Sequence, residues 1–191
     1  PETGEVVTLG YNTQISDKTN ISASVFSSKI NDAIDWVYLE ADDTFKTAVN
    51  IKSEKRRGLE LSVDHALNDA VDLYASYTYQ KVKQDMDDGK GYIGDPLNKP
   101  NVFKTGVKYK ENNWLVNLTM KAATGQSETR YTSNDYFTID LGAQYNVSGN
   151  TKIFAQLNNL NNASYEESGD ARLGRYPMAS RNFVVGMEYS F

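Results

Sequence analysis

Apolar and polar residues alternate along the last part of the chain. From Phe183 onward every second residue is apolar, and small or polar residues such as Gly186 and Glu188 stand between them. A period of two places successive side chains on opposite faces of a β-strand, so this segment is predicted to be a strand with one apolar face. The alternation runs to Phe191, so an aromatic residue closes the segment.

The same alternation recurs in eight earlier stretches. It is clearest between Val71 and Gln80, where Leu73, Ala75 and Tyr77 alternate with polar neighbours. No stretch predicts a helix, so the fold class is predicted to be all-β, with antiparallel strands joined by turns. The predicted strands span about residues 5–14, 20–30, 49–64, 71–80, 103–109, 114–120, 136–145, 153–157 and 183–191.

Short and long connections follow one another in strict order. Those after the first, third, fifth and seventh strands are tight turns, around Ser16–Lys18, Leu67–Ala70, Glu111–Asn113 and Ser148–Asn150. The remaining connections are long and polar. Transmembrane β-barrels have short periplasmic turns and long extracellular loops, so the pattern predicts a barrel with its long loops outside the cell.

Aromatic residues near the strand ends agree with this prediction, because tyrosine and tryptophan favour the two membrane–water interfaces. Two girdles are predicted from them. One lies at the tight turns (Tyr11, Tyr109, Trp114, Tyr145, Tyr189), and the other lies at the long loops (Trp36, Tyr38, Tyr77, Tyr79, Phe137).

The overall composition changes this picture little. Hydrophobic residues make up 39% and the mean hydropathy is -0.59, so no window approaches the roughly 18 apolar residues of a spanning helix. A membrane barrel needs apolar residues only on its lipid face, so a polar average is compatible with it. The net charge of -5 provides no basic face for nucleic acid, and no nucleic-acid partner is expected.

The strand number raises a question of closure. Single-chain bacterial barrels usually have even strand numbers, and an open strand edge in lipid leaves backbone groups without partners. Nine strands are therefore not expected to close by themselves. Either one strand has escaped the prediction, or further strands of the same barrel lie outside residues 1–191.

Several short segments occur in an order that resembles the C-terminal part of TonB-dependent outer-membrane receptors. Together they extend over essentially the whole chain. They are Pro1-Glu2 with Leu9–Tyr11, Arg57–Ser62, Pro96–Asn101, Asn159-Leu160 with Tyr165, and Tyr176–Phe183 continuing to Phe191.

The resemblance implies the last part of a 22-stranded barrel filled by an N-terminal plug, which lies outside this sequence. The last loop is most similar to catecholate siderophore and colicin I receptors, although Ala179-Ser180 departs from their usual residues before Arg181. The implied function is uptake of an iron chelate, with an iron–siderophore ligand and with TonB engaged through the plug. Tyr189 and Phe191 would form the membrane-insertion signal read by the barrel-assembly machinery, and outer-membrane lipid and lipopolysaccharide would surround the wall.

Other functions remain open at this point. Haem and cobalamin receptors share much of the same frame, and a small self-contained barrel with an anchoring or adhesion role would show the same alternation. An enzyme is not expected, because the single histidine, His65, has no recognisable catalytic partners. No cofactor is expected either.

Candidate ligand-binding residues gather in the last two long loops. Bulky anionic chelates need aromatic faces and arginine donors. Acidic neighbours in the last loop, Glu166, Glu167 and Asp170, leave open that the arginines are paired internally. The candidates are Arg130, Tyr131, Tyr165, Arg172, Arg175 and Tyr176.

Two further segments carry notable charge. Arg56 and Arg57 are expected to form salt bridges or to contact lipopolysaccharide. The acidic segment from Asp85 to Gly89 resembles part of a calcium-binding loop but lacks the closing glutamate. A solvated loop is the favoured interpretation, so no metal site is predicted.

Overall fold

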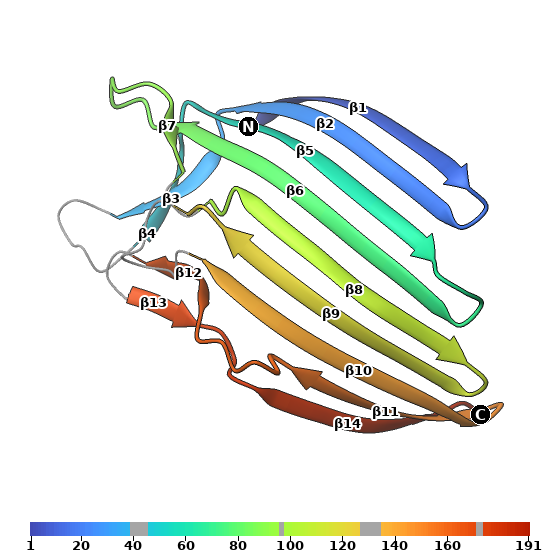
Figure 1. Cartoon of the computed structure of the whole chain (residues 1–191). Helices are drawn as coiled ribbons and strands as arrows, with labels where there is room; N and C mark the ends of the chain where they lie inside the picture. Colours follow the sequence, from blue (N-terminus) through green and yellow to red (C-terminus); the bar gives the residue numbers. More distant parts are fainter. Residues whose placement is uncertain (39–45, 96–97, 127–134, 171–173) are drawn as a thin grey trace.

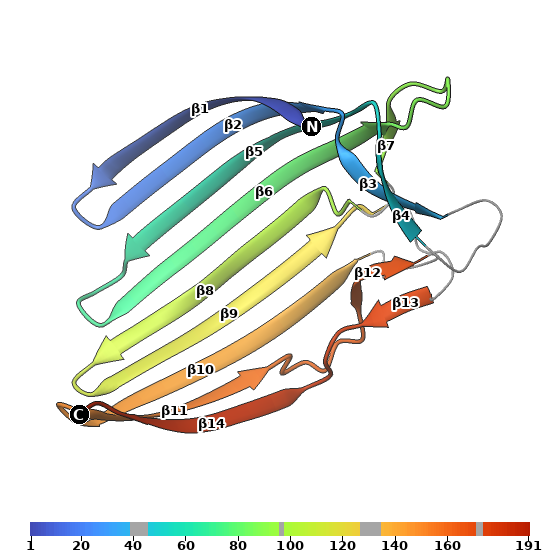
Figure 2. The same cartoon turned by 180° about the vertical axis from the view of Figure 1, so that it is seen from behind.

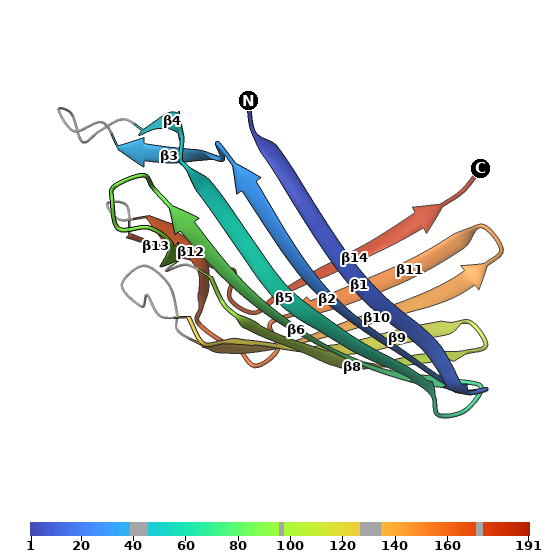
Figure 3. The same cartoon turned by 90° about the horizontal axis from the view of Figure 1, so that it is seen from above.

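The computed structural model describes residues 1–38, 46–95, 98–126, 135–170 and 174–191. Within these residues long antiparallel strands form a single curved sheet (Figures 1 and 3). Its path runs β1 (Thr3–Ser16), β2 (Thr19–Asn31), β5 (Ser53–Ala66), β6 (Val71–Asp85), β8 (Asn101–Glu111), β9 (Trp114–Thr124), β10 (Tyr136–Ser148), β11 (Thr151–Asn158) and β14 (Asn182–Tyr189). The short β7 (Ile93–Gly94) pairs with β6. The all-β fold class and its antiparallel strands are confirmed.

Two hairpins stand apart from the sheet. They are β3 (Ile34–Tyr38) with β4 (Lys46–Asn50), and β12 (Glu166–Asp170) with β13 (Gly174–Pro177). Both lie at the end of the sheet opposite the tight turns, as the view from behind also shows (Figure 2). Among the described residues, no helix is long and apolar enough to cross a membrane.

The sequence interpretation was wrong in several places, since β3 and β7 lie within connections that were predicted to be loops. The predicted third strand, from about Val49, is in fact β4 followed by β5. The chain breaks between them because Ile51 N donates to Ala33 O (2.7 Å) and Lys52 N donates to Asp85 O (3.1 Å), instead of continuing one ladder. The last long loop was also expected to be irregular, whereas β12 and β13 pair within it.

The cross-strand register sorts side chains into an apolar face and a polar face. In β10, Leu141 pairs with Leu118 of β9 and Leu157 of β11, and Leu157 pairs with Phe183 of β14. The preceding and following positions of every strand turn to the polar face. Large side chains of the apolar face are therefore exposed, as Leu61 (47%) and Val185 (70%) are. Such a contiguous apolar surface is the one that a barrel wall presents to lipid.

The predicted aromatic positions within the long strands lie on this apolar face, whereas Trp36 and Tyr38 belong to β3, apart from the sheet. At the tight-turn end the rings of Trp114 and Tyr145 are 4.8 Å apart, and towards the loop end Tyr77 stacks on Phe103 at 4.6 Å. Only a few apolar residues are buried in the described part, Ile51 and Val82 among them. A single curved sheet has no internal core, so its stability depends on what covers its two faces.

Candidate ligand-binding site

Asn159 fixes the start of the last loop, directly after β11. Its backbone N donates to the Asp140 carboxylate at 2.8 Å, and its side-chain amide exchanges two 2.8 Å hydrogen bonds with the backbone of Ala163. It also donates to Ala179 O at 3.2 Å, so the same amide joins both ends of the loop. The residue is 4% exposed and has a left-handed φ of 52°, a conformation that asparagine tolerates well.

Asn161 continues this bracing along β10. Its side chain accepts a hydrogen bond from Ile139 N (3.0 Å) and donates one to Phe137 O (2.8 Å). β11 ends at Asn158, so these amide groups take the place of strand pairing for the end of β10. Asn162 accepts a hydrogen bond from Arg181 N at 3.0 Å and secures the return of the loop into β14.

A charged and aromatic cluster ties the β12–β13 hairpin to the polar face. Lys121 Nζ donates to Glu167 Oε1 at 2.8 Å, and Tyr136 OH donates to the same oxygen at 2.5 Å. The rings of Tyr136 and Tyr165 stack with centroids 4.3 Å apart. The hydrogen bonds from Lys121 and Tyr136 hold the pKa of the Glu167 carboxyl below its usual range. Glu167 is therefore the group that latches the hairpin to β9 and β10.

Lys99 completes the cluster from the segment before β8. Its ammonium lies 5.8 Å from the centroid of the Tyr136 ring, and its Nζ is buried without a hydrogen-bond partner in the described part of the chain. Burial lowers the pKa of Lys99. The nearby carboxylates of Glu167 and Glu166 act on this pKa in the opposite direction, so the ammonium has charged neighbours although it donates no hydrogen bond among the described residues. A buried ammonium without a hydrogen bond is costly, so this position is suited to an acceptor supplied by another molecule or segment.

The structure places some of the predicted ligand-binding residues and not others. Tyr165 and Tyr176 both belong to the braced loop, Tyr165 against the polar face and Tyr176 exposed (43%) on β13. Arg175 lies opposite Gly169, and its guanidinium is 3.7 Å from the buried Glu166. For Arg175 the internal pairing left open by the sequence is present. Arg130, Tyr131 and Arg172 lie outside the described residues.

Lys99, Lys121 and Tyr136 were not predicted as site residues. Lys121 and Tyr136 occupy polar-face positions of strands that were predicted correctly, so a large aromatic and a cation at those positions were the available signals. Lys99 had no local signal, because its position depends on the fold of the loop.

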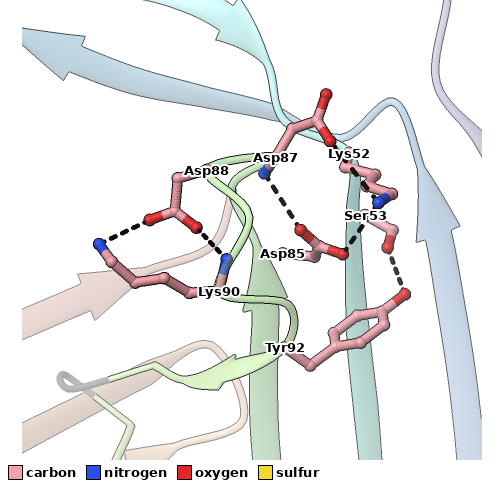
Figure 4. A network of polar contacts seen from close by, with 7 residues as sticks. All are labelled: Lys52, Ser53, Asp85, Asp87, Asp88, Lys90 and Tyr92. Carbon is pink, nitrogen blue, oxygen red and sulfur yellow. Dashed lines mark hydrogen bonds and ion pairs between the residues drawn. The ribbon is translucent and has the colours of Figure 1, made fainter.

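The acidic segment after β6 is bound by lysines (Figure 4). Lys52 Nζ lies 3.6 Å from both Asp85 and Asp87, and Lys90 Nζ lies 2.8 Å from Asp88. These contacts raise the pKa of Lys52, while the hydrogen bonds from Lys90 lower the pKa of Asp88. No group of three or more metal-ligating acidic, histidine or cysteine side chains is present in the portion that the structure describes.

The predicted insertion signal lies at the tight-turn end of the sheet. Tyr189 is the last residue of β14, and its ring meets that of Phe191 edge-on at 5.1 Å. Both side chains are exposed on the described surface. Their role as an insertion signal stays a prediction.

The chain is similar to known proteins in sequence and in fold. The family described as "TonB dependent receptor-like, beta-barrel" matches residues 1–160. No curated protein sequence matches. Among solved structures, "Copper transporter OprC" is similar with a TM-score of 0.80 and 22% identity, over 100% of this chain and 31% of that one.

Two further similar structures come from Pseudomonas aeruginosa. The ferripyoverdine receptor of the outer membrane gives a TM-score of 0.70 and 15% identity, over 100% of this chain and 27% of its own. The siderophore receptor PirA gives a TM-score of 0.69 and 17% identity, over 100% of this chain and 30% of its own. The chain thus spans less than a third of the length of each of these proteins, and at these identities the likeness concerns the fold.

Proposed function

Because the chain belongs to the TonB-dependent receptor family, we propose that it forms the C-terminal barrel wall of a receptor that takes up an iron chelate. The chain is an outer-membrane protein, with the apolar face towards lipid and the polar face towards the lumen. The preceding strands and a plug domain that engages TonB are proposed to come from sequence outside this chain.

The observation that carries the proposal is the cluster of Lys99, Tyr136 and Tyr165 beneath the β12–β13 hairpin. Stacked tyrosine rings and a buried ammonium without a hydrogen-bond partner among the described residues provide an aromatic surface and a positive charge at the same place. Iron–siderophore complexes are bulky, and the catecholate ones are anionic, so they match both features. Two of the similar structures are named as a ferripyoverdine and a siderophore receptor, which favours this ligand class over haem or cobalamin.

In the proposed mechanism the chelate binds at the extracellular mouth, and the latched hairpin presents Tyr176 beside it. Movement of the energised plug then opens a passage to the periplasm. Transport requires no covalent change in the chelate, so no catalytic group is assigned to this chain.

The test uses a bacterial strain from which its own iron-chelate receptors have been deleted. Expression of the full-length receptor that contains this chain is expected to restore growth on a ferric catecholate or hydroxamate chelate as the sole iron source. Haem, cobalamin and copper are supplied to parallel cultures as controls. Growth or uptake with one of these controls alone would refute an iron-chelate receptor.

A further inference from the structure

The apolar face ends in rows of cations at the loop end of β2, β5 and β6. Arg57 lies directly opposite Lys81, and Lys55 lies between Lys29 and Lys83 in one cross-strand row. The pairing has no register shift between these rows and the apolar row that contains Leu59. The five cationic side chains therefore project from the lipid-facing side of the wall, just beyond its apolar band, and not into the lumen.

Like charges directly opposite one another destabilise a sheet unless an anion lies between them. Among the described residues none of these cations forms an ion pair. One carboxylate, Glu5, lies in the same row, opposite Lys29 at the edge. Arg56, the neighbour of Arg57, points to the polar face and is paired with Glu54 at 2.5 Å. Arg56 and Arg57 thus have different environments.

Tyr92 builds one wall of this surface. It belongs to the loop after β6, and its hydroxyl is hydrogen-bonded to Ser53 (Figure 4). The Nζ of Lys55 lies 3.7 Å from the centroid of its ring. The hydrogen bond to Ser53 lowers the pKa of Tyr92, and Lys55 and Lys29 contribute to the same shift. Lys55, Arg57, Lys81, Lys83 and Tyr92 line a hollow of about 380 Å³.

The acidic residues of the same loop do not neutralise the hollow. Asp85 and Asp87 are bound to Lys52, and Asp88 is bound to Lys90. The loop therefore contributes an aromatic ring to the cationic surface, while Asp85, Asp87 and Asp88 form ion pairs with other lysines. The hollow is left with an excess of positive charge.

We propose that this hollow binds the phosphate groups of a lipopolysaccharide molecule in the outer leaflet. The cations lie where the headgroups meet the wall, and the apolar row with Leu59 and Tyr79 directly below them is placed to receive the acyl chains. Arginine binds phosphate through paired hydrogen bonds and lysine binds it as a point charge. A soluble anion in the lumen does not fit this position, because the hollow opens on the opposite face.

The test compares three versions of the full-length receptor in detergent: wild type, Arg57→Gln/Lys81→Gln/Lys83→Gln, and a control with Lys18→Gln/Lys108→Gln/Lys110→Gln. Both variants lose the same number of charges, but the control positions lie towards the tight-turn end. The three substituted cations of the hollow are exposed, so the sheet is expected to fold normally. Electrophoretic migration of the receptor before and after heating will establish whether it has folded. If the triple variant does not fold, Lys81→Gln/Lys83→Gln replaces it.

Binding is measured with bisphosphorylated lipid A and with its dephosphorylated form. The hollow variant is expected to bind bisphosphorylated lipid A at least about tenfold more weakly than wild type, which corresponds to ~1.4 kcal/mol, and the difference should shrink at high salt. The control variant should bind like wild type, and all three proteins should bind dephosphorylated lipid A equally. Unchanged binding by the hollow variant, or an equal loss in the control, would overturn the proposal.

Discussion

Phe26 lies directly opposite Gly58 across the β2–β5 pair, and its ring covers the glycine on the polar face. A methyl group added to Gly58 would lie 2.5 Å from Phe26 Cζ. The same relation joins Tyr74 to Gly106 across β6 and β8, and Phe154 to Gly186 across β11 and β14. Aromatic rings that cover glycines across a sheet protect the backbone and fix the register.

Alanine at these glycines should therefore destabilise the wall. Gly58→Ala is expected to cost about 1–3 kcal/mol, because the added methyl overpacks the ring and the neighbouring backbone. Gly142→Ala is the matched control, since Gly142 is also in a strand interior but has no atom within 4 Å of an added Cβ. Thermal unfolding of the full-length receptor measures both. Equal stability of the two variants would contradict the packing that the pairs indicate.

The two faces of the wall should differ sharply in their tolerance of charge. Leu141→Arg is expected to cost about 2–4 kcal/mol, because Leu141 faces lipid between Leu118 and Leu157. Ser76→Arg on the polar face should have a mild effect. Thr138 would be a poor control, although its position in the strand suggests a lumen-facing site, because it is only 4% exposed.

Folding titrations into lipid vesicles give the two free energies. A similar loss for Leu141→Arg and Ser76→Arg would show that the apolar face does not meet lipid.

The long strands and their faces could be predicted because their signal is local. A period of two, interrupted by turn residues such as Gly149 and Asn112, is contained in ten consecutive residues and needs no knowledge of distant contacts. The nine-strand path, the tight turns and the apolar rows follow from it.

The contacts that hold the last loop and its β12–β13 hairpin against β9 and β10 could not be predicted in the same way. Residues Glu166–Asp170 are almost uniformly polar, so no alternation marks β12 as a strand. Asn159 and Asn161 act through a few long-range hydrogen bonds to β10, and Lys99 reaches Tyr136 only after the loop has folded. Contacts of this kind are specified by the tertiary fold and leave no periodic pattern.

The attachment of the β12–β13 hairpin to Lys121 and Tyr136 should depend on pH through Glu167. The pKa of this carboxyl is depressed in the folded protein, so its contribution is fully present above the ordinary value of 4.5 and is lost as the pH falls through the lower folded value. The protection factors of the β12–β13 hairpin amides, which correct for the slower intrinsic exchange in acid, should therefore fall below about pH 4.5, before those of the strands of the sheet.

Glu167→Gln is the control for this effect. Glutamine retains the shape and an acceptor oxygen but cannot titrate. The hairpin amides of this variant should therefore be less protected than those of wild type at neutral pH, and their protection factors should not fall further in acid. An acid dependence that persists in Glu167→Gln would assign the titration to another group.

The last prediction concerns Lys99 and the ligand together. Methionine at this position removes a buried charge that has no hydrogen-bond partner in the described part of the chain, while it keeps most of the side-chain volume. The ligand-free receptor should become more stable, by about 1–3 kcal/mol, because an unpaired buried polar group is costly. If the ammonium meets an anionic chelate, the same variant should bind that chelate more weakly, by about 1.5–3 kcal/mol for one charged hydrogen bond.

Lys104→Met, on the polar face of β8, is the matched control and should change neither the stability nor the affinity by a comparable amount. Thermal unfolding without ligand and calorimetric titration with a ferric catecholate measure the two effects. A loss of stability in the ligand-free Lys99→Met receptor would mean that a segment of the receptor, and not the chelate, supplies the counter-charge.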